Sequence, residues 1–253
     1  MKLGLASDFD GTFYFEGQQP PCKEVDIQAI HAFQQAGHLF GCCTGRDYDS
    51  IRQPLKSIDL TLDYYIVASG AAILDAKGNI CFERLMAQKD IDGLFEKYHG
   101  KADMYLRGRN NTFAMQAHAE SSFRAIHIQR PDQVGADAFI QGVSFGCYSK
   151  EDAQWISESV NQTFEDIVAY RNVTFVDIVS RDCSKGNGCQ KAKELFGIDR
   201  LGGIGDFYND LPLFEGSDVS FTFDRSPASL QKQVDHVVTD LADAVHILME
   251  ENK

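Results

Sequence analysis

Two aspartates separated by one residue form the most chemically suggestive pattern in the chain, Asp8-Phe9-Asp10-Gly11-Thr12. They follow the apolar run Leu3–Ser7, which predicts a buried strand, and Gly11 permits a sharp turn beneath them. Ligands of open α/β sheets bind beyond the carboxyl ends of the strands. At such a place one carboxylate can attack or hold a metal ion while the other moves a proton. Because Asp-Gly is also a common turn, the pattern needs support from the rest of the chain.

Three further polar side chains stand at predicted strand ends or helix starts. Thr44 ends the predicted strand His38–Cys43, Lys185 opens a helix, and Asp206 ends the strand Leu201–Gly205. Each has an ordinary structural interpretation: a helix N-cap, a solvated first-turn residue and a turn, respectively. Together with the aspartate pair, all at one edge of a parallel sheet, they predict a single catalytic site.

The predicted elements that position these residues change character along the chain. Alternating strands and helices in the first 80 residues predict a parallel sheet covered on both faces. Hairpins and short strands then follow, among them Asp103–Leu106, Thr112–Gln116 and Val143–Tyr148. The alternation of strands and helices resumes after Ser184-Lys185. We therefore expect an α/β fold with a core of residues 1–80 and 183–253, split by an inserted α+β domain of residues 81–182.

Composition limits the possible partners. A net charge of -13 argues against nucleic acid and anionic membranes as partners, and no apolar stretch approaches membrane-spanning length. The odd number of cysteines, seven, without a Cys-x-x-Cys pair predicts reduced thiols, a cytoplasmic location and no zinc site. We expect a monomer or weak homodimer. An anionic substrate would need a local cation in so acidic a chain.

The order of the motifs resembles the four-motif signature of the haloacid dehalogenase (HAD) superfamily of phosphotransfer enzymes. The matching residues are Asp8-x-Asp10-Gly-Thr, Thr44-Gly-Arg, Lys185 and Gly205-Asp206-x-x-Asn209-Asp210. The long insertion resembles the large, C2-type cap of the Cof-type subgroup. The resemblance covers the whole chain and implies a Rossmann-like parallel-sheet core with a cap. It also implies a phosphatase acting on small phosphorylated metabolites such as sugar phosphates.

The resemblance implies distinct catalytic roles for the motif residues. Asp8, ionised, would attack the phosphorus and form a phospho-aspartyl intermediate. Asp10, protonated at the start, would give its proton to the leaving alcohol and later remove one from water. Thr44, Lys185 and Asn209 would hold the oxygens of the transferring phosphoryl group.

Bringing a phosphate dianion to an ionised carboxylate requires a cation. Two like unit charges 4 Å apart repel by about 4 kcal/mol at an effective dielectric constant of 20, and one lysine does not offset that together with the neighbouring acids. Oxygen ligands favour Mg²⁺. We expect the ion on the Asp8 carboxylate, the Asp10 main-chain carbonyl and Asp206, with Asp210 behind them or on a metal-bound water.

Two other functions remain open from the sequence. A phosphomutase of the same superfamily would use the same aspartates but return the phosphoryl group to the sugar, so it would need a bisphosphate and release no net phosphate. A sensor of phosphorylated metabolites would bind without turnover, although the intact catalytic set argues against it.

The chain departs from the subgroup pattern at Phe13, at Ser69-Gly70-Ala71 and at Phe223-Asp224-Arg225-Ser226. These departures remove no catalytic group, but they prevent a substrate from being carried over from a relative.

The role of the arginines is also open. We expect Arg46 to be a structural ion-pair partner. Arg107 and Arg109 could reach an anionic substrate, but a solvated hairpin is the favoured interpretation. Arg225 lies in a segment that departs from the family pattern, and it is a further candidate for substrate contact.

Overall fold

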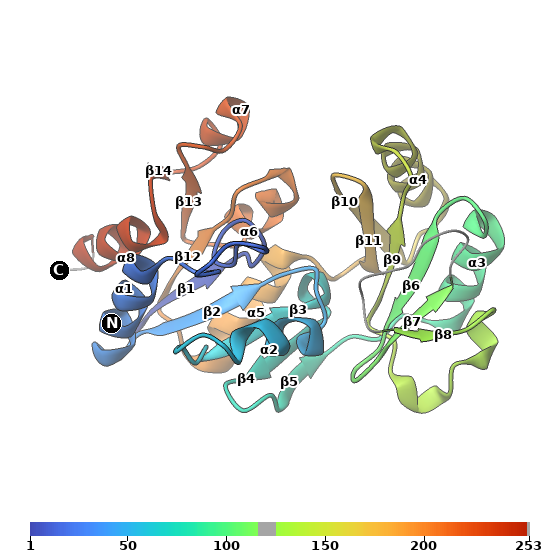
Figure 1. Cartoon of the computed structure of the whole chain (residues 1–253), viewed down its shortest axis with the longest axis horizontal. Coiled ribbons are helices and arrows are strands. Elements are labelled where there is room, and N and C mark those ends of the chain that lie inside the picture. Colours follow the sequence, from blue (N-terminus) through green and yellow to red (C-terminus); the bar gives the residue numbers. More distant parts are fainter. Residues whose placement is uncertain (116–124, 252–253) are drawn as a thin grey trace.

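The protein consists of two lobes, each built on its own β-sheet (Figure 1). The structure is a computed structural model that describes residues 1–115 and 125–251. The chain builds part of the first lobe, crosses into the second, and returns to complete the first, so both termini lie on the first lobe. We call the first lobe the core and the second the cap.

The core sheet has eight strands in the order β14-β13-β12-β1-β2-β3-β4-β5. The six strands from β14 to β3 are parallel, and β4 and β5 extend the sheet as an antiparallel hairpin. The strand bounds are β1 (Leu3–Ser7), β2 (Leu39–Cys43), β3 (Tyr64–Val67), β4 (Ala72–Asp75), β5 (Ile80–Glu83), β12 (Arg200–Ile204), β13 (Val219–Phe223) and β14 (His236–Val238).

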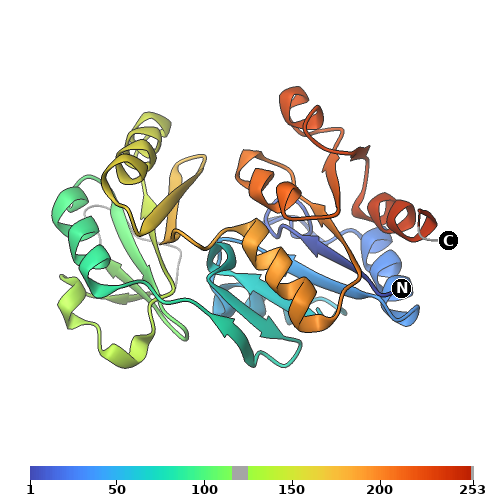
Figure 2. The same cartoon turned by 180° about the vertical axis from the view of Figure 1, so that it is seen from behind.

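Helices cover both faces of the core sheet, as the continuous apolar character of its strands predicts. One face carries α1, α2 and α8, whose side chains share an apolar cluster with Leu5 and Phe221. The other carries α5, α6 and α7, which pack on Ile66 and Leu201 (Figure 2). The helix bounds are α1 (Glu24–Gln35), α2 (Tyr48–Leu55), α5 (Lys185–Phe196), α6 (Leu211–Glu215), α7 (Ala228–Gln231) and α8 (Leu241–Glu250).

The cap is a six-stranded sheet, in the order β10-β11-β9-β6-β7-β8, with helices on one face only. Leu94 of α3 and Ile156 of α4 pack against Phe145, while the opposite face of the sheet is turned toward the core. The bounds are α3 (Gln88–Tyr98), α4 (Lys150–Thr163), β6 (Asp103–Arg107), β7 (Thr112–Met115), β8 (Ala125–His127), β9 (Gly142–Gly146), β10 (Ile167–Asn172) and β11 (Phe175–Ser180). The expected parallel-sheet core with an inserted α+β cap is confirmed.

The details differ from expectation at the first domain boundary. Strand β5, most of which the sequence assigned to the inserted domain, pairs with β4 in the core sheet, so the core extends to Glu83 instead of residue 80. The reason is local, because a hairpin pairs with its sequence neighbour more readily than with a distant strand. The short elements β8 and α7 were not predicted, and Gln116, the expected end of a cap strand, lies outside the described residues.

Two features predicted from composition, the state of the cysteines and the membrane-spanning potential, can be compared with the structure. All seven cysteines are free thiols. Among the described residues, no helix combines the length and apolar character needed to cross a bilayer.

Candidate active site

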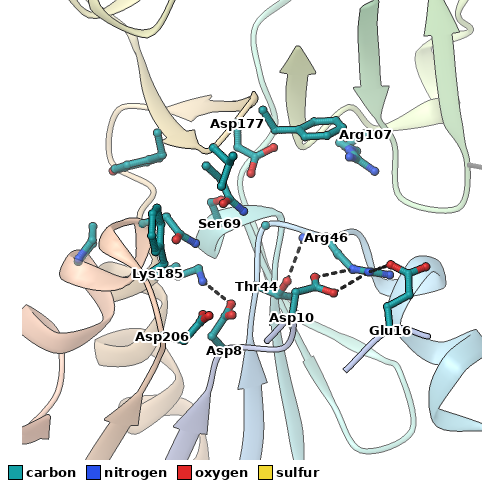
Figure 3. A pocket seen from close by; sticks show the side chains of 18 residues that line it. Asp8, Asp10, Glu16, Thr44, Arg46, Ser69, Arg107, Asp177, Lys185 and Asp206 are labelled. Atoms are coloured by element: carbon teal, nitrogen blue, oxygen red, sulfur yellow. Dashed lines mark hydrogen bonds and ion pairs between the residues drawn. The ribbon is translucent and has the colours of Figure 1, made fainter. Parts of the chain in front are cut away.

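The polar residues singled out in the sequence meet in a cavity of about 400 Å³ between the core and the cap (Figure 3). Asp8 follows β1, Thr44 follows β2 and Asp206 follows β12, and these strands are parallel neighbours in the core sheet. Their carboxyl ends therefore open onto one edge, where all three side chains line the cavity together with Lys185. Ser69, after β3, extends the same edge.

Lys185 connects two buried carboxylates. Its ammonium nitrogen lies 2.5 Å from Asp8 Oδ1 and 2.6 Å from Asp210 Oδ1. The residue is 5% exposed and begins α5, where Ser184 caps the helix by accepting the N–H of Asn187 at 2.9 Å. Burial alone would lower the lysine pKa, but Asp210 and Asp8 raise it above its ordinary value, so the side chain stays charged.

The nucleophile candidate Asp8 lies in an acidic environment. Burial, and then the charge of Asp210, raise the pKa of Asp8 well above its ordinary value, although Lys185 opposes the shift. A buried carboxylate with this environment is stabilised by a cation placed against it. The electrostatics of the site therefore favour metal binding at Asp8.

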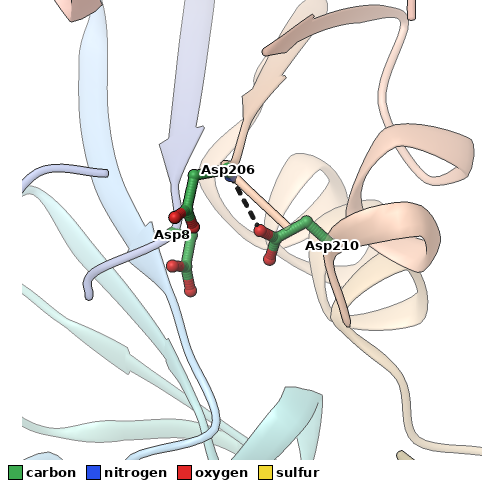
Figure 4. A group of neighbouring side chains, drawn as sticks. All are labelled: Asp8, Asp206 and Asp210. Carbon is green, nitrogen blue, oxygen red and sulfur yellow. Dashed lines mark hydrogen bonds between the residues drawn. The ribbon is translucent and has the colours of Figure 1, made fainter. Parts of the chain in front are cut away.

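Asp8, Asp206 and Asp210 form a compact acidic group in which one oxygen from each lies within 4.8 Å of the others (Figure 4). Asp210 is completely buried, and its Oδ2 accepts the N–H groups of Asp206 at 3.0 Å and Phe207 at 3.2 Å. Because its other oxygen accepts from Lys185, Asp210 acts on the site by holding the loop that carries Asp206. Burial and the charge of Asp210 raise the pKa of Asp206 to about 6.

This acidic group fits Mg²⁺. Among the described residues, Lys185 forms ion pairs with Asp8 and Asp210 and no cation pairs with Asp206, so carboxylates outnumber the paired cations, and the donors are oxygens. Gly11, with φ of +76°, allows the loop after Asp8 to pass close to Asp206, since a Cβ at that position would lie 2.8 Å from Asp206 Oδ2. That close approach places the backbone around Asp10 beside the carboxylates.

Asp10 lines the same cavity, but its carboxylate is bound by Arg46. Arg46 Nε lies 2.7 Å from Asp10 Oδ2, and Arg46 Nη2 lies 2.6 Å from Asp10 Oδ1. The expectation that Arg46 is an ion-pair partner is confirmed. Its guanidinium also lies 5.4 Å from the centre of the Phe9 ring, a cation–π contact that helps to hold Arg46 in place.

Two of the residues expected to hold phosphoryl oxygens, Thr44 and Asn209, line the cavity. Thr44 is buried, and its hydroxyl oxygen accepts the N–H of Arg46 at 3.2 Å, which leaves the hydroxyl proton available to a ligand oxygen. Asn209 lies in the short helix Tyr208–Asp210 and lines the cavity. The roles of these residues stay predictions.

The favoured interpretation of Arg107 as a solvated hairpin residue is wrong. Arg107 is 6% exposed and lines the cavity, because alternation along β6 puts it on the sheet face turned toward the core. Its Nη1 lies 3.2 Å from Asp47 Oδ2, and Thr112 donates to the same oxygen at 3.0 Å. Asp47 Oδ1 meanwhile accepts the N–H of Ser50 at the start of α2. One carboxylate of the core therefore caps a helix and binds the cap.

The other two arginines do not line the cavity. Arg109 forms an ion pair with Glu83 and lies over the ring of Phe139, 3.9 Å from its centre. Arg225 donates from Nη2 to the carbonyl of Gly11 at 2.9 Å and covers Phe223. Arg225 thus supports the loop that carries Asp10.

No role was predicted for the loop after β3. Ala68, Ser69 and Gly70 all have positive φ, at 47°, 51° and 91°. A Cβ on Gly70 would lie 2.1 Å from the carbonyl oxygen of Ser184, so glycine lets this loop press against the helix start that carries Lys185. The only sequence signal was the departure from the family pattern at Ser69.

A second missed residue is Asp177, which reaches the cavity from the cap. Burial raises its pKa, against the opposing effect of Arg107. Alternation along β11, where Val176 and Ile178 are buried in the cap, could have placed Asp177 on the opposite face of the sheet.

Comparison with known proteins gives a consistent result. The family described as haloacid dehalogenase-like hydrolase matches residues 5–245. The putative phosphatase YxeH of Bacillus subtilis (strain 168) is 24% identical over 226 residues, which span 83% of this chain and 83% of that protein. Among solved structures, a haloacid dehalogenase-like hydrolase from B. subtilis superposes with a TM-score of 0.82 at 16% identity, covering 98% of this chain and 99% of that one. The HAD subclass IIB sugar phosphatase BT4131 gives 0.77 at 17% identity, covering 100% and 98%.

Proposed function

This chain belongs to the haloacid dehalogenase-like hydrolases, in their Cof-type group, and on that premise we propose that it is a Mg²⁺-dependent phosphatase of small phosphorylated metabolites. One observation carries the proposal: Lys185 joins Asp8 and Asp210 in a cavity that Thr44 and Asp206 also line. A nucleophile, a cation beside it and donors for phosphoryl oxygens are the parts that phosphoryl transfer needs.

In the first step, an Asp8 carboxylate oxygen attacks the phosphorus and the bond to the leaving oxygen breaks. Asp10 gives its proton to that oxygen, so an alcohol departs and an acyl phosphate remains on Asp8. In the second step, Asp10 takes a proton from water as the water attacks the phosphorus. Inorganic phosphate leaves, and both aspartates return to their starting states.

The surrounding residues hold the phosphoryl group during both steps. The Lys185 ammonium and the Thr44 hydroxyl would donate to its oxygens, and Asn209, which lines the same cavity, would assist them. Asp8 and Asp206 would hold Mg²⁺, with Asp210 fixing the loop of Asp206. When bound, the ion neutralises the repulsion between the phosphate and the carboxylates.

Sugar phosphates are the proposed substrate class. The similarity to the sugar phosphatase BT4131 and to the putative phosphatase YxeH supports this class. A cavity of about 400 Å³ is of the size that takes a small metabolite.

The test is phosphate release from a panel of sugar phosphates, nucleotides and cofactor phosphates, with Mg²⁺ and with a chelator. We expect Asp8→Asn to abolish turnover and the chelator to suppress it, while Asp59→Asn, at an exposed aspartate outside the cavity, turns over normally. Turnover by Asp8→Asn, or indifference to the chelator, refutes the mechanism. A requirement for a sugar bisphosphate without net phosphate release would identify a phosphomutase, and binding without turnover a sensor.

A further inference from the structure

The face of the cap sheet that carries no helix supplies a row of side chains above the reaction centre. Strand pairing aligns Tyr170, Asp177, Ser144 and Tyr105 across β10, β11, β9 and β6. Directly paired residues of neighbouring strands point to the same face, so these four share the face that is turned toward the core. Asp177 is the acidic member of the row, and it lines the cavity.

The carboxylate of Asp177 is held in place from one side and open on the other. Its Oδ1 accepts the Ser144 hydroxyl at 2.6 Å, and no described residue donates a hydrogen bond to Oδ2. A Cβ built on Gly45 would lie 2.6 Å from Oδ2, so the carboxylate stands directly over the residue that follows Thr44. Figure 3 shows it facing the cavity above Lys185 and Thr44. A leaving group attached to a phosphoryl group at Thr44 must pass beside it.

Arg107, a cap cation whose charge acts on Asp177, forms hydrogen bonds with other residues. Arg107 binds Asp47 at 3.2 Å through Nη1 and the Ser144 hydroxyl at 3.2 Å through Nε, and it is almost fully buried. Asp47 therefore balances the charge of Arg107. Among the described cap residues that line the cavity, Asp177 is the acidic one, so its carboxylate lies where a leaving group would be received.

The hairpin of β10 and β11 supplies apolar and aromatic surface at this end, together with the polar side chain of Asn172. Tyr170, Val173 and Phe175, from the hairpin of β10 and β11, line the cavity. Val173 has φ of +54°, which is unfavourable for a β-branched residue, and its side chain is 44% exposed at the hairpin tip. Apolar surface beside hydrogen-bonding groups such as Asp177 and Asn172 suits a ring with carbon faces and hydroxyl edges.

We propose that Asp177 selects the leaving group: its carboxylate accepts hydrogen bonds from the hydroxyls of a neutral sugar or polyol, and it repels leaving groups that carry a second anionic group. This inference rests on the proposed phosphatase function and narrows its substrate class to neutral monophosphates. Ser144 acts as a positioning residue, because its hydroxyl fixes the carboxylate.

The test compares two substrates that differ at one carbon, glucose 1-phosphate and glucuronic acid 1-phosphate. We expect the wild-type enzyme to favour the neutral sugar in kcat/KM by at least about tenfold, and Asp177→Asn to reduce that preference about tenfold, equivalent to about 1.4 kcal/mol. Ser144→Ala should reduce it less. The ratio of two kcat/KM values from one preparation does not depend on the fraction of folded protein, so a poorly folding variant still gives an answer.

Glu16→Gln is the matched control. Glu16 also lines the cavity with a carboxylate, but its side chain is 82% exposed on the rim of the core, so its removal should leave the substrate ratio within about twofold. An unchanged ratio in Asp177→Asn, or an equal change in Glu16→Gln, overturns the assignment of Asp177. Hydrolysis of p-nitrophenyl phosphate by the wild-type enzyme separates the two proposals. If it is absent, the phosphatase function itself fails; if it is present with an unchanged ratio, only the role of Asp177 fails.

Discussion

Arg46 binds both carboxylate oxygens of Asp10, at 2.7 Å through Nε and at 2.6 Å through Nη2. A bidentate pair of this kind occupies the oxygen that would carry a proton to a leaving group. Asp10 must therefore separate from Arg46 during turnover if it is the proton donor. Arg46 therefore fixes the Asp10 side chain, and the proposed proton transfer requires this ion pair to open.

This relationship predicts unequal effects at the two residues. Asp10→Asn removes the proton donor, so we expect kcat on alkyl phosphates to fall at least about a hundredfold, and less on p-nitrophenyl phosphate, whose leaving group needs no proton. Arg46→Ala only releases Asp10, so its loss should stay below about tenfold. Steady-state kinetics on both ester types measure the difference. Equal losses at the two positions would show that Arg46 acts in the chemistry itself.

Replacing Lys185 by methionine should destabilise the protein as well as inactivate it. The substitution leaves Asp8 and Asp210 buried without their shared cation, a change that costs about 3–5 kcal/mol in unfolding free energy. Urea denaturation measures it. The control is Lys193→Met, which removes a more exposed pair with Asp218 and should cost less than about 1 kcal/mol. Similar losses for the two variants would mean that Lys185 is not the ion that balances the site.

Asp206 should destabilise the metal-free protein at neutral pH. Burial and Asp210 raise its pKa from 3.8 to about 6, so between these values the folded protein holds a proton that the unfolded chain has lost. The contribution of this group to stability therefore falls as pH rises through that window. We expect Asp206→Asn, without Mg²⁺ at neutral pH, to raise the unfolding free energy by about 1–2 kcal/mol and to lose the stabilisation that Mg²⁺ gives the wild type.

Asp235→Asn is the control, and its expected effect on the unfolding free energy has the opposite sign. The hydroxyl and N–H of Ser220 lower the pKa of Asp235, so Asp235→Asn should decrease stability at neutral pH and leave the Mg²⁺ response intact. Thermal denaturation with chelator and with added Mg²⁺ gives both readings. A metal-free Asp206→Asn variant less stable than the wild type would contradict the predicted cost of that carboxylate.

Gly70→Ala should be far more damaging than a glycine substitution with the same backbone angle elsewhere. Gly70 and Gly37 have φ of +91° and +87°, but a Cβ on Gly37 meets nothing within 4 Å, whereas one on Gly70 lies 2.1 Å from Ser184 O. Gly37→Ala should cost about 1–2 kcal/mol from the left-handed conformation alone. Gly70→Ala should exceed it by at least about 2 kcal/mol and also lower kcat, because the helix start before Lys185 must shift. Chemical denaturation and kinetics on both variants test this.

The positions of Asp8, Thr44 and Asp206 were predictable because each lies within two residues of the end of a strand, and parallel strands end at one edge. Chain direction alone then decides which side chains meet. The sequence predicted that Arg46 forms an ion pair, but it did not identify Asp10 as the partner. The choice of partner depends on side-chain rotamers in the folded state.

Asp177 and Arg107 were not predictable in the same way. Their place above the core depends on how the cap is oriented, and that orientation follows from contacts between residues far apart in the chain, such as Asp47 with Arg107 and Gly45 with Asp177. Strand alternation identifies which face each side chain occupies, but it does not say what lies opposite that face.

The hydrogen bonds of Asp47 have a consequence for the apparent affinity of the enzyme. Its carboxylate ties α2 to Arg107 and Thr112 of the cap, so moving the cap away from the core breaks both contacts across the interface. A ligand that enters only when they are broken binds with its intrinsic dissociation constant divided by the fraction of molecules that are open. A high KM in this protein would therefore reflect a small fraction of open molecules as much as weak contacts with the substrate. Removing the contacts of Asp47 with the cap would lower KM without any change in the residues that touch the substrate.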